Sequence, residues 1–206
     1  MTGDENEAPG PAVVLELRPS TAIVRLARPA ERNSLSVATL KELDSAVSSL
    51  AARTDIHSII FTGTGDVFAA GADIRELAQL TADAAAEFAA RGQRLFRKIA
   101  EARQLTVAAV NGYCMGGGLD LALSCDVRCA APAAVFAHPG ARLGIITGWG
   151  GTQRLPRLIG TARALELFCT ARRVGAREAY EIGLVSEIGE PVLDCAVEMA
   201  ARRLTS

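Results

Sequence analysis

The sequence predicts an α/β fold. Short apolar runs rich in β-branched residues, typical of buried strands, alternate with longer runs in which apolar residues recur at helical spacing. Half of the 206 residues are hydrophobic, which is enough for a sizeable core. The alternation is typical of α/β units joined by right-handed crossovers, in which ligands bind at the carboxyl ends of the strands. Two glycine-bearing loops fall at such strand ends and mark the candidate site.

The elements follow one another in a regular order. Two β-rich runs, 13–18 and 21–27, are joined by Pro19-Ser20 and predict a hairpin. A helix is predicted to begin near Ser36 and a longer one at Thr81, which is expected to act as its cap. Further strands are predicted at 58–62, 106–110 and 127–130. Further helices are predicted at 73–80, 117–124, 151–159, 161–170, 175–182 and 191–204, so the last third is expected to be mostly helical.

Composition and charge narrow the possible partners. The net charge of −1 gives no electrostatic basis for binding nucleic acid or an anionic membrane, and no apolar run reaches the ~20 residues of a membrane span. Residues 1–11 are acidic and polar and predict a flexible tail, with 12–206 forming a single domain. Five cysteines without a C-x-x-C pair, and only two histidines, argue against a zinc site. An odd cysteine count excludes a complete internal disulfide framework, so a reduced, cytoplasmic protein is expected.

The two glycine loops predict a pair of backbone hydrogen-bond donors. The first is Phe68-Ala69-Ala70-Gly71-Ala72-Asp73-Ile74, and the second runs from Asn111 to Asp120 with three consecutive glycines. Two such loops can direct two N–H groups at one oxygen, as an enzyme that forms an enolate from a thioester requires. Glycines without a Cβ allow a ligand to approach the backbone closely. The alternative is that the glycine triplet only permits tight packing of a helix on a strand.

Three segments together resemble one known family. Residues 68–74, 111–126 and 148–160 are similar to those of the enoyl-CoA hydratase/isomerase family, the crotonase superfamily. Arg28-Pro29 with Asn33-Ser34-Leu35 resembles its first CoA-side loop, and 179–187 resembles its late A-x-x-x-G-L-V segment. The resemblance covers roughly 13–205. It implies a crotonase-like (ClpP/crotonase) fold of repeated ββα units with a helical C-terminal part, here expected to be truncated at the C-terminus, and assembly as a homotrimer or hexamer.

The resemblance also implies a lyase-type activity and particular site residues. The substrate would be an acyl-CoA thioester, with coenzyme A as part of the substrate and no metal or redox cofactor. The oxyanion donors would be the N–H groups of Ala72 and Gly117. Arg75 would lie near the nucleotide phosphates, with Arg32 as a further candidate, although a solvated surface charge is the alternative for each arginine. The positions that the resemblance places along the bound substrate are Arg28, Ala30, Ala70, Asp73, Ile74, Arg75, Gly116 and Gly140.

The chain departs from the family where its hydratases carry two catalytic glutamates. Asp120 stands at the first position and Gly140 at the second. A base must come within ~2.6–3.2 Å of the proton it takes, so a shortened carboxylate and a missing one should impair hydration. Restoring both glutamates is expected to raise the rate. His138 is the candidate substitute, since a histidine suits proton transfer near neutral pH. Residues two apart on a strand share a face, so the side chain of His138 would lie on the same face as position 140 but not at the same point.

Several functions remain open at this stage. Hydration of enoyl-CoA is the family default. Isomerisation of a double bond or decarboxylation needs less acid–base machinery, and a non-catalytic acyl-CoA-binding protein would need none. Trp149 is expected to form the floor of the acyl pocket or to pack against a helix, and Cys114 to be a small buried hydrophobic residue rather than a nucleophile. Gly63-Thr64-Gly65 is the one feature that would suggest a nucleotide-binding Rossmann fold, and this reading fails because Phe68 stands where the third glycine of the G-x-G-x-x-G motif belongs.

Overall fold

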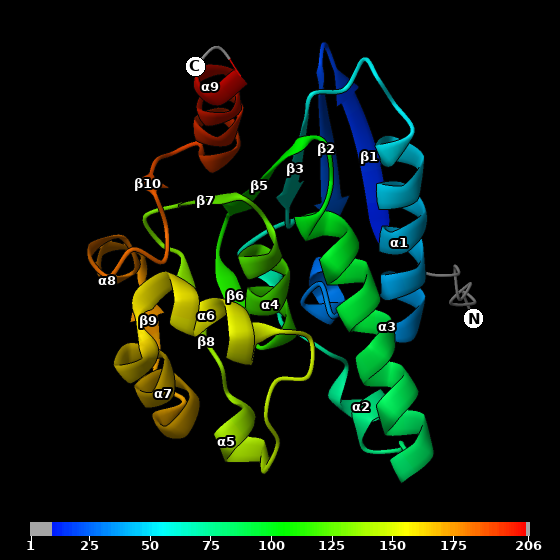
Figure 1. Ribbon diagram of the computed structural model, residues 1–206, viewed down its shortest axis with the longest axis vertical. Helices are drawn as coiled ribbons and strands as arrows, with labels where there is room; N and C mark the ends of the chain where they lie inside the picture. The colour runs from blue at the N-terminus through cyan, green and yellow to red at the C-terminus, as the bar shows by residue number, and fades with distance from the viewer. Residues whose placement is uncertain (1–9, 205–206) are drawn as a thin grey trace, which may run out of the picture.

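The computed structural model describes residues 10–204, so most of the expected tail lies outside the described residues. A six-stranded sheet forms the centre of the molecule (Figure 1). The first two strands pair antiparallel, which confirms the predicted hairpin, and the others pair parallel. In spatial order the strands are β1 (Val13–Arg18), β2 (Thr21–Leu26), β3 (Ser58–Thr62), β5 (Leu105–Val110), β7 (Val127–Ala130) and β10 (Glu187–Ile188).

A second, four-stranded sheet was not predicted from the sequence. Its strands are β4 (Val67–Ala69), β6 (Tyr113–Met115), β8 (Val135–Ala137) and β9 (Val174–Gly175), in that order. Each has only two or three residues, which is too short for an alternating pattern to be recognised. β3, β5 and β7 lie in the large sheet, and the strand that follows each of them lies in the small one. The chain therefore winds in repeated β-β turns, with helices between them.

The predicted helices are mostly confirmed. Ser36 and Thr81 cap α1 and α3, because their side chains accept hydrogen bonds from the N–H groups of Thr39 and Ala84. The helix expected at 73–80 is shorter than predicted, and α5 was not predicted. The helices are α1 (Val37–Ala51), α2 (Ile74–Leu77), α3 (Ala82–Ala100), α4 (Gly117–Ser124), α5 (Gly140–Leu143), α6 (Gly151–Ile159), α7 (Thr161–Thr170), α8 (Ala176–Glu181) and α9 (Val192–Leu204), with a 3-10 turn at Pro29–Glu31.

Helices cover both faces of the large sheet. On one face Ala196 and Met199 of α9 pack against Ile60 and Val107, and in Figure 1 this helix stands apart from the others at the C-terminal end. On the other face α1, α3 and α4 enclose the larger core, which includes Phe61, Phe68, Phe96 and Phe136. The carboxyl ends of β4 and β6 thus meet under α3, where the two glycine loops lie.

Residues 10–204 contain neither a membrane-spanning helix nor a metal-binding cluster. None of the described helices has the length and apolar character needed to cross a membrane. No group of three or more His, Cys, Asp or Glu residues in this part of the chain could hold a metal ion.

Candidate active site

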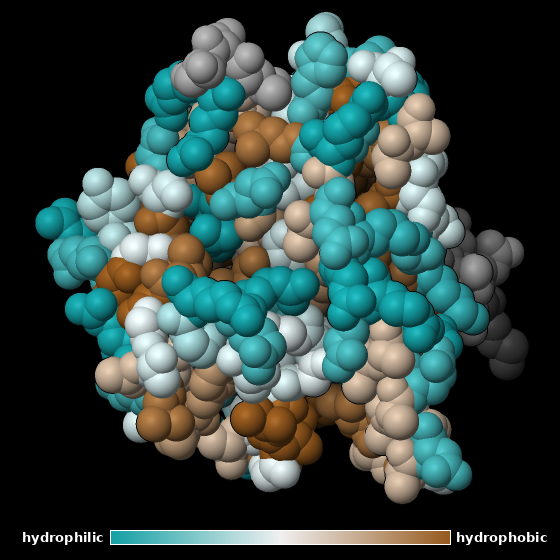
Figure 2. All heavy atoms as spheres, viewed as in Figure 1, coloured by the Kyte–Doolittle hydropathy of each residue, from teal (hydrophilic) through white to brown (hydrophobic). Residues whose placement is uncertain are grey.

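Both glycine loops border one apolar cleft of about 290 Å³. α2 and α3 form one wall, and α5 with the loop after it forms the other. The mouth carries exposed apolar side chains, with Ile74 62% and Ile146 68% exposed. Figure 2 shows hydrophobic atoms gathered over α5 and this loop. The residues that line the cleft are Ala70, Gly71, Ala72, Ile74, Leu77, Leu80, Ala85, Phe88, Ala89, Gly116, Gly117, His138, Pro139, Gly140, Leu143, Ile145, Ile146, Thr147, Gly148 and Trp149.

The N–H groups of Ala72 and Gly117 lie side by side in the cleft wall. A Cβ added at Gly71 would be 2.9 Å from Gly117 N, and one added at Gly117 would be 3.4 Å from Ala72 N. Gly71 also has a φ of +96°, a conformation that favours glycine. Gly117 opens α4, so its N–H has no acceptor within the helix. Within residues 10–204 neither N–H donates a hydrogen bond, so both donors are available to a ligand.

Trp149 forms the floor of the cleft and also packs against helices, so both expectations hold. Its ring lies 5.2 Å from that of Phe88 and 5.6 Å from that of Phe96, measured between centroids, and its Nε1 donates to the Phe88 carbonyl at 3.4 Å. A Cβ added at Gly117 or at Gly92 would come within 2.4 Å and 2.3 Å of the indole. The absence of side chains at these two glycines therefore makes room for the tryptophan.

Asp120, His138 and Thr147 form a polar cluster beside the cleft, in which Asp120 and His138 are buried and Thr147 is half-buried. The Asp120 side chain is fully buried, and its Oδ2 accepts a hydrogen bond from the Thr147 hydroxyl. Asp120 Oδ1 lies 3.3 Å from His138 Nε2. A Cβ added at Gly151, the first residue of α6, would lie 2.1 Å from Asp120 Oδ1. The carboxylate therefore sits at a helix N-terminus, where the helix dipole favours a negative charge.

His138 connects this cluster to the cleft. It is 3% exposed and lines the cleft, whereas Asp120 does not. Its ring packs against that of Phe168, with the centroids 5.0 Å apart and the ring planes tilted by 45°. Of the two imidazole nitrogens, Nε2 is fully buried and has no hydrogen-bond partner. Nδ1 is therefore the nitrogen that contacts the cleft. Within the described part of the chain His138 is the only titratable side chain that lines the cleft.

The expected relation between positions 138 and 140 is wrong. β8 ends at Ala137, and Gly140 begins α5, so the two residues do not alternate along a strand. A Cβ at Gly140 would lie 2.5 Å from the Ile145 carbonyl oxygen. The Ile145 backbone therefore approaches position 140 so closely that only glycine fits there without a shift of this loop. A glutamate there would need the Ile145 backbone to move, which weakens the expectation that restoring the two glutamates raises the rate.

The expected substrate-binding residues divide into two groups. Ala70, Ile74, Gly116 and Gly140 line the cleft, whereas the remaining four do not. Arg28 donates from Nε to the Gly10 carbonyl at 3.0 Å, and Ala30 lies in the 3-10 turn. Asp73 caps α2 by accepting from Arg75 N at 2.8 Å and also pairs with the Arg75 guanidinium at 2.6 Å.

The Asp73–Arg75 pair stands at the rim of the site. The Arg75 guanidinium lowers the pKa of the Asp73 carboxyl from its ordinary value, and burial opposes this shift. The Arg75 side chain is 75% exposed, so it can still contact a ligand.

Cys114 is fully buried in β6, as expected of a small hydrophobic residue. Burial, with a further contribution from the Asp120 carboxylate, raises the pKa of the Cys114 thiol well above its ordinary value. A thiol in that state is a poor nucleophile.

Sequence reasoning gave no role to three residues that organise the site, although Asn33 and Asn111 stand in the segments that carry the resemblance. Asn111 accepts from Gly63 N at 2.9 Å and donates to the Gly65 carbonyl, and Asn33 donates to the Val67 carbonyl at 2.7 Å. These bonds fix the corner from which β4 enters the first glycine loop. Thr147 donates a hydrogen bond to Asp120 and lies in the loop after α5. No local sequence pattern predicts that this loop folds over the cleft. An asparagine directly after a predicted strand was the one available signal for Asn111.

Solved structures define the class of protein to which this fold belongs. The crystal structure of an enoyl-CoA hydratase from Bacillus anthracis superposes with a TM-score of 0.90 at 35% sequence identity, covering 95% of this chain and 77% of that chain. The fold is therefore crotonase-like, as the resemblance implied.

Sequence comparison identifies the family. The model described as enoyl-CoA hydratase/isomerase matches residues 16–205. A crotonyl-CoA hydratase from Syntrophomonas wolfei is 43% identical over 180 residues, which are 87% of this chain and 69% of that protein. A short-chain-enoyl-CoA hydratase from Clostridium acetobutylicum is 39% identical over 191 residues, 91% of this chain and 73% of that protein. The chain belongs to the enoyl-CoA hydratase/isomerase family.

Proposed function

We propose that the chain binds acyl-CoA thioesters in the cleft and adds water reversibly across the double bond of an enoyl-CoA. The observation that carries the proposal is the pair of unpartnered N–H groups, Ala72 and Gly117, bordering one apolar cavity. Similarity to relatives named crotonyl-CoA hydratase and short-chain-enoyl-CoA hydratase supports the same substrate class. Coenzyme A enters only as part of the substrate.

The two N–H groups stabilise the enolate. When a nucleophile adds at Cβ of an α,β-unsaturated thioester, negative charge develops on the carbonyl oxygen. Each backbone donor aimed at such an oxygen lowers the barrier by about 3 kcal/mol. Gly117 is the first residue of the eight-residue helix α4, so the positive end of the helix dipole adds to the effect.

His138 acts as the proton-transfer group. Its imidazole takes a proton from water while the water oxygen bonds to Cβ, and the electron pair of the double bond moves to form the enolate. The resulting imidazolium then gives a proton to Cα, so one molecule of water is added and the imidazole is regenerated. This assignment is supported by the absence of any other titratable side chain from the cleft wall formed by the described residues.

Asp120 is a positioning residue. Its carboxylate lies behind His138 and does not line the cleft, so it acts on the imidazole rather than on the substrate. A negative charge 3.3 Å from Nε2 stabilises the imidazolium that forms during the reaction. The Thr147 hydroxyl holds the other carboxylate oxygen and so fixes its orientation.

Double-bond isomerisation is a second candidate, favoured by the presence of one proton-transfer group in an otherwise apolar cleft. A single base can remove a proton from Cα of a 3-enoyl thioester and return it to Cγ, with no water consumed. Hydration instead requires an ordered water molecule in a cavity that offers it few polar partners. Both reactions use the same enolate.

The test compares substrates and a non-carbonyl analogue. Purified protein is incubated with crotonyl-CoA and, separately, with a 3-enoyl-CoA, and products are separated by chromatography. Water addition to the first supports hydration, and conversion of the second to the conjugated isomer supports isomerisation. Binding of crotonyl-CoA and of its thioether analogue, which lacks the carbonyl, is measured by calorimetry. Equal affinity for the two would contradict the roles of Ala72 and Gly117. Binding without turnover of either substrate would indicate a non-catalytic acyl-CoA-binding protein.

We also propose that the chain assembles as a homotrimer or a hexamer. Support comes from apolar side chains left exposed on the helices beside the small sheet, namely Leu158 at 36%, Leu165 at 59% and Tyr180 at 52% exposed. Light scattering of the purified protein measures the mass directly, and a monomer at all concentrations would contradict this assembly.

A further inference from the structure

We infer that Arg154 of α6 is a positioning residue for the reaction, because it holds the loop at 144–150, which carries Thr147 and Trp149. Arg154 borders a second pocket, of about 450 Å³. This pocket shares Thr147, Gly148 and Trp149 with the cleft, but Arg154 does not line the cleft. The guanidinium therefore acts on the loop and not on the substrate. The inference rests on the function proposed for the cleft.

The Arg154 guanidinium connects this loop to a neighbouring helix. Its Nη1 donates to the Trp149 carbonyl at 3.0 Å, and its Nη2 donates to the Phe96 carbonyl of α3 at 3.3 Å. A guanidinium presents its donors as a rigid planar fork, so one side chain can bind two carbonyl groups at once. The ammonium of a lysine lacks this fork. Arg154 thus fixes the position of the loop relative to α3.

The backbone at Gly150 leaves room for the guanidinium. Gly150 has a φ of +109°, a left-handed conformation that favours glycine. A Cβ at this position would lie 2.2 Å from Arg154 Nη1. A larger residue would push the guanidinium away from the Trp149 carbonyl. The glycine before α6 and the arginine within it therefore depend on each other.

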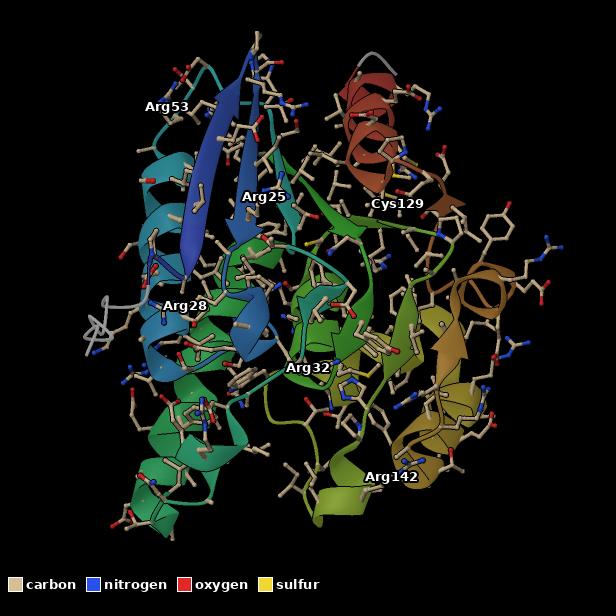
Figure 3. All side chains as sticks on the ribbon, turned by 180° about the vertical axis from the view of Figure 1, so that it is seen from behind. Arg25, Arg28, Arg32, Arg53, Cys129 and Arg142 are labelled. Carbon is tan, nitrogen blue, oxygen red and sulfur yellow. The ribbon has the colours of Figure 1, made fainter. Side chains whose placement is uncertain are left out.

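Arg154 differs from the arginines that bind carboxylates at the surface. Arg28 and Arg53, which are labelled beside α1 in Figure 3, pair with Glu42 and Asp55. Arg154 is half-buried and forms no ion pair with any residue between 10 and 204. Its donors are directed at backbone carbonyls instead, which is the arrangement expected of a side chain that holds a loop.

The charge of Arg154 is also linked to the polar cluster. Burial lowers the pKa of the Arg154 guanidinium, the Asp120 carboxylate raises it, and the Arg97 cation lowers it again. Among the charged groups around Arg154, Asp120 thus favours the cation most. Arg154 therefore reaches the cluster in two ways, through the loop that carries Thr147 and through its positive charge.

One other polar side chain binds the backbone of the loop from α3. Gln93 donates from Nε2 to the Gly148 carbonyl at 2.7 Å, but this bond is exposed. The Trp149 indole makes a longer bond, of 3.4 Å, to the Phe88 carbonyl. Water competes for an exposed hydrogen bond more than for one that is partly shielded. The partly buried bonds of Arg154 are therefore expected to decide where the loop lies.

The first experiment uses Trp149 as the probe, since it is the only tryptophan of the sequence. Fluorescence emission is recorded for the wild type, Arg154→Met and Arg157→Met. Arg157 lies on α6 at the same pocket, but it is exposed and forms no ion pair with the described residues, so it controls for loss of charge. We expect Arg154→Met to shift the emission to longer wavelength, because the indole gains contact with water. Arg157→Met should match the wild type.

The second experiment measures turnover of the thioester. In Arg154→Met, kcat should fall by at least about tenfold, because a displacement of about 1 Å can cost about 10²-fold in rate. Affinity for butyryl-CoA should fall less than kcat, because Arg154 does not hold the two backbone N–H groups. Arg157→Met should keep the kcat of the wild type. Arg154→Lys keeps the charge and loses the fork, so it should show both effects in weaker form, and it replaces Arg154→Met if that variant does not fold.

A double-mutant cycle tests the route by which Arg154 acts. Thr147→Val removes the hydroxyl that binds Asp120. If Arg154 acts through the loop, the loss of kcat in the double variant is smaller than the product of the two single losses. Independent losses, whose product equals that of the double variant, would contradict this route.

Two further results would overturn the inference. One is an equal emission maximum in Arg154→Met and Arg157→Met, and the other is a shifted emission with unchanged kcat. If the wild type neither binds nor converts a thioester, the function proposed for the cleft is wrong. The emission spectra would still show, without any turnover, whether Arg154 holds Trp149 in place.

Discussion

His138 Nε2 lies 3.3 Å from Asp120 Oδ1, yet the two atoms do not have the geometry of a hydrogen bond. Both are fully buried, and neither has another partner among the described residues. Leaving such groups unpaired costs about 1–3 kcal/mol each, and native proteins accept this cost chiefly at catalytic sites or where water binds. The pair is therefore arranged to strengthen when His138 becomes protonated.

The first prediction concerns this pair. We expect His138→Gln to lower kcat for the thioester reaction by about 10²–10⁴, because the group that transfers the proton is lost. Asp120→Asn should lower kcat by about 10-fold or more, since the imidazolium loses its counter-charge. Affinity for butyryl-CoA, which keeps the carbonyl and lacks the double bond, should stay within about twofold in both variants, because neither residue supplies the two backbone N–H groups. Unchanged kcat in His138→Gln at normal stability would remove His138 from the mechanism.

The second prediction concerns Gly140. Introducing Gly140→Glu together with Asp120→Glu should not produce an efficient hydratase, because a Cβ at 140 would lie 2.5 Å from the Ile145 carbonyl oxygen. Displacing this backbone should lower the thermal midpoint, with overpacking costs of about 1–3 kcal/mol. Initial rates with crotonyl-CoA and thermal melts of both single variants and the double variant measure these effects. A rate increase without loss of stability would indicate that the loop at Ile145 moves freely.

The large sheet and its helices could be predicted because their signals are local. Ser58–Thr62 is a buried strand with the apolar run Ile59-Ile60-Phe61 at its centre. Ser36 and Thr81 are cap residues before helices whose apolar residues recur periodically. The small sheet could not be predicted, since strands such as Tyr113–Met115 are stabilised by pairing with distant segments rather than by their own pattern.

The candidate site divides in the same way. The glycine loops carry a local signature, and the family resemblance then places the two donors at Ala72 and Gly117. The cluster of Asp120, His138 and Thr147 could not be assembled, because it depends on how the loop at 144–150 folds back onto α4.

The third prediction concerns the floor of the cleft. Gly92→Ala places a methyl group 2.3 Å from Trp149 Cδ1, so the indole must move toward the cleft. We expect a loss of about 1–3 kcal/mol in the free energy of unfolding and weaker binding of acyl-CoA with longer acyl groups. Gly175→Ala is the matched control, because a Cβ there meets no atom within 4 Å. Denaturant unfolding and titration with acyl-CoAs of two lengths measure both effects. Equal behaviour of the two variants would contradict the tight packing of Trp149.

The fourth prediction concerns pH and Asp73. This carboxylate caps α2 at Arg75 N, and its pKa is lowered chiefly by the Arg75 guanidinium. Because the pKa is lower in the folded than in the unfolded protein, the carboxylate stabilises the fold above its unfolded pKa of about 4, and this contribution is lost as the pH falls through the folded value. Asp73→Asn should therefore cost at most about 1 kcal/mol at pH 7, since Arg75 is largely solvated and asparagine still caps a helix. At pH 3 the difference from the wild type should shrink. Arg75→Gln, which keeps the cap and removes the cation, should reproduce most of the loss at pH 7. A difference that grows on acidification, measured by chemical unfolding at the two pH values, would show that Asp73 is not held as a carboxylate by Arg75.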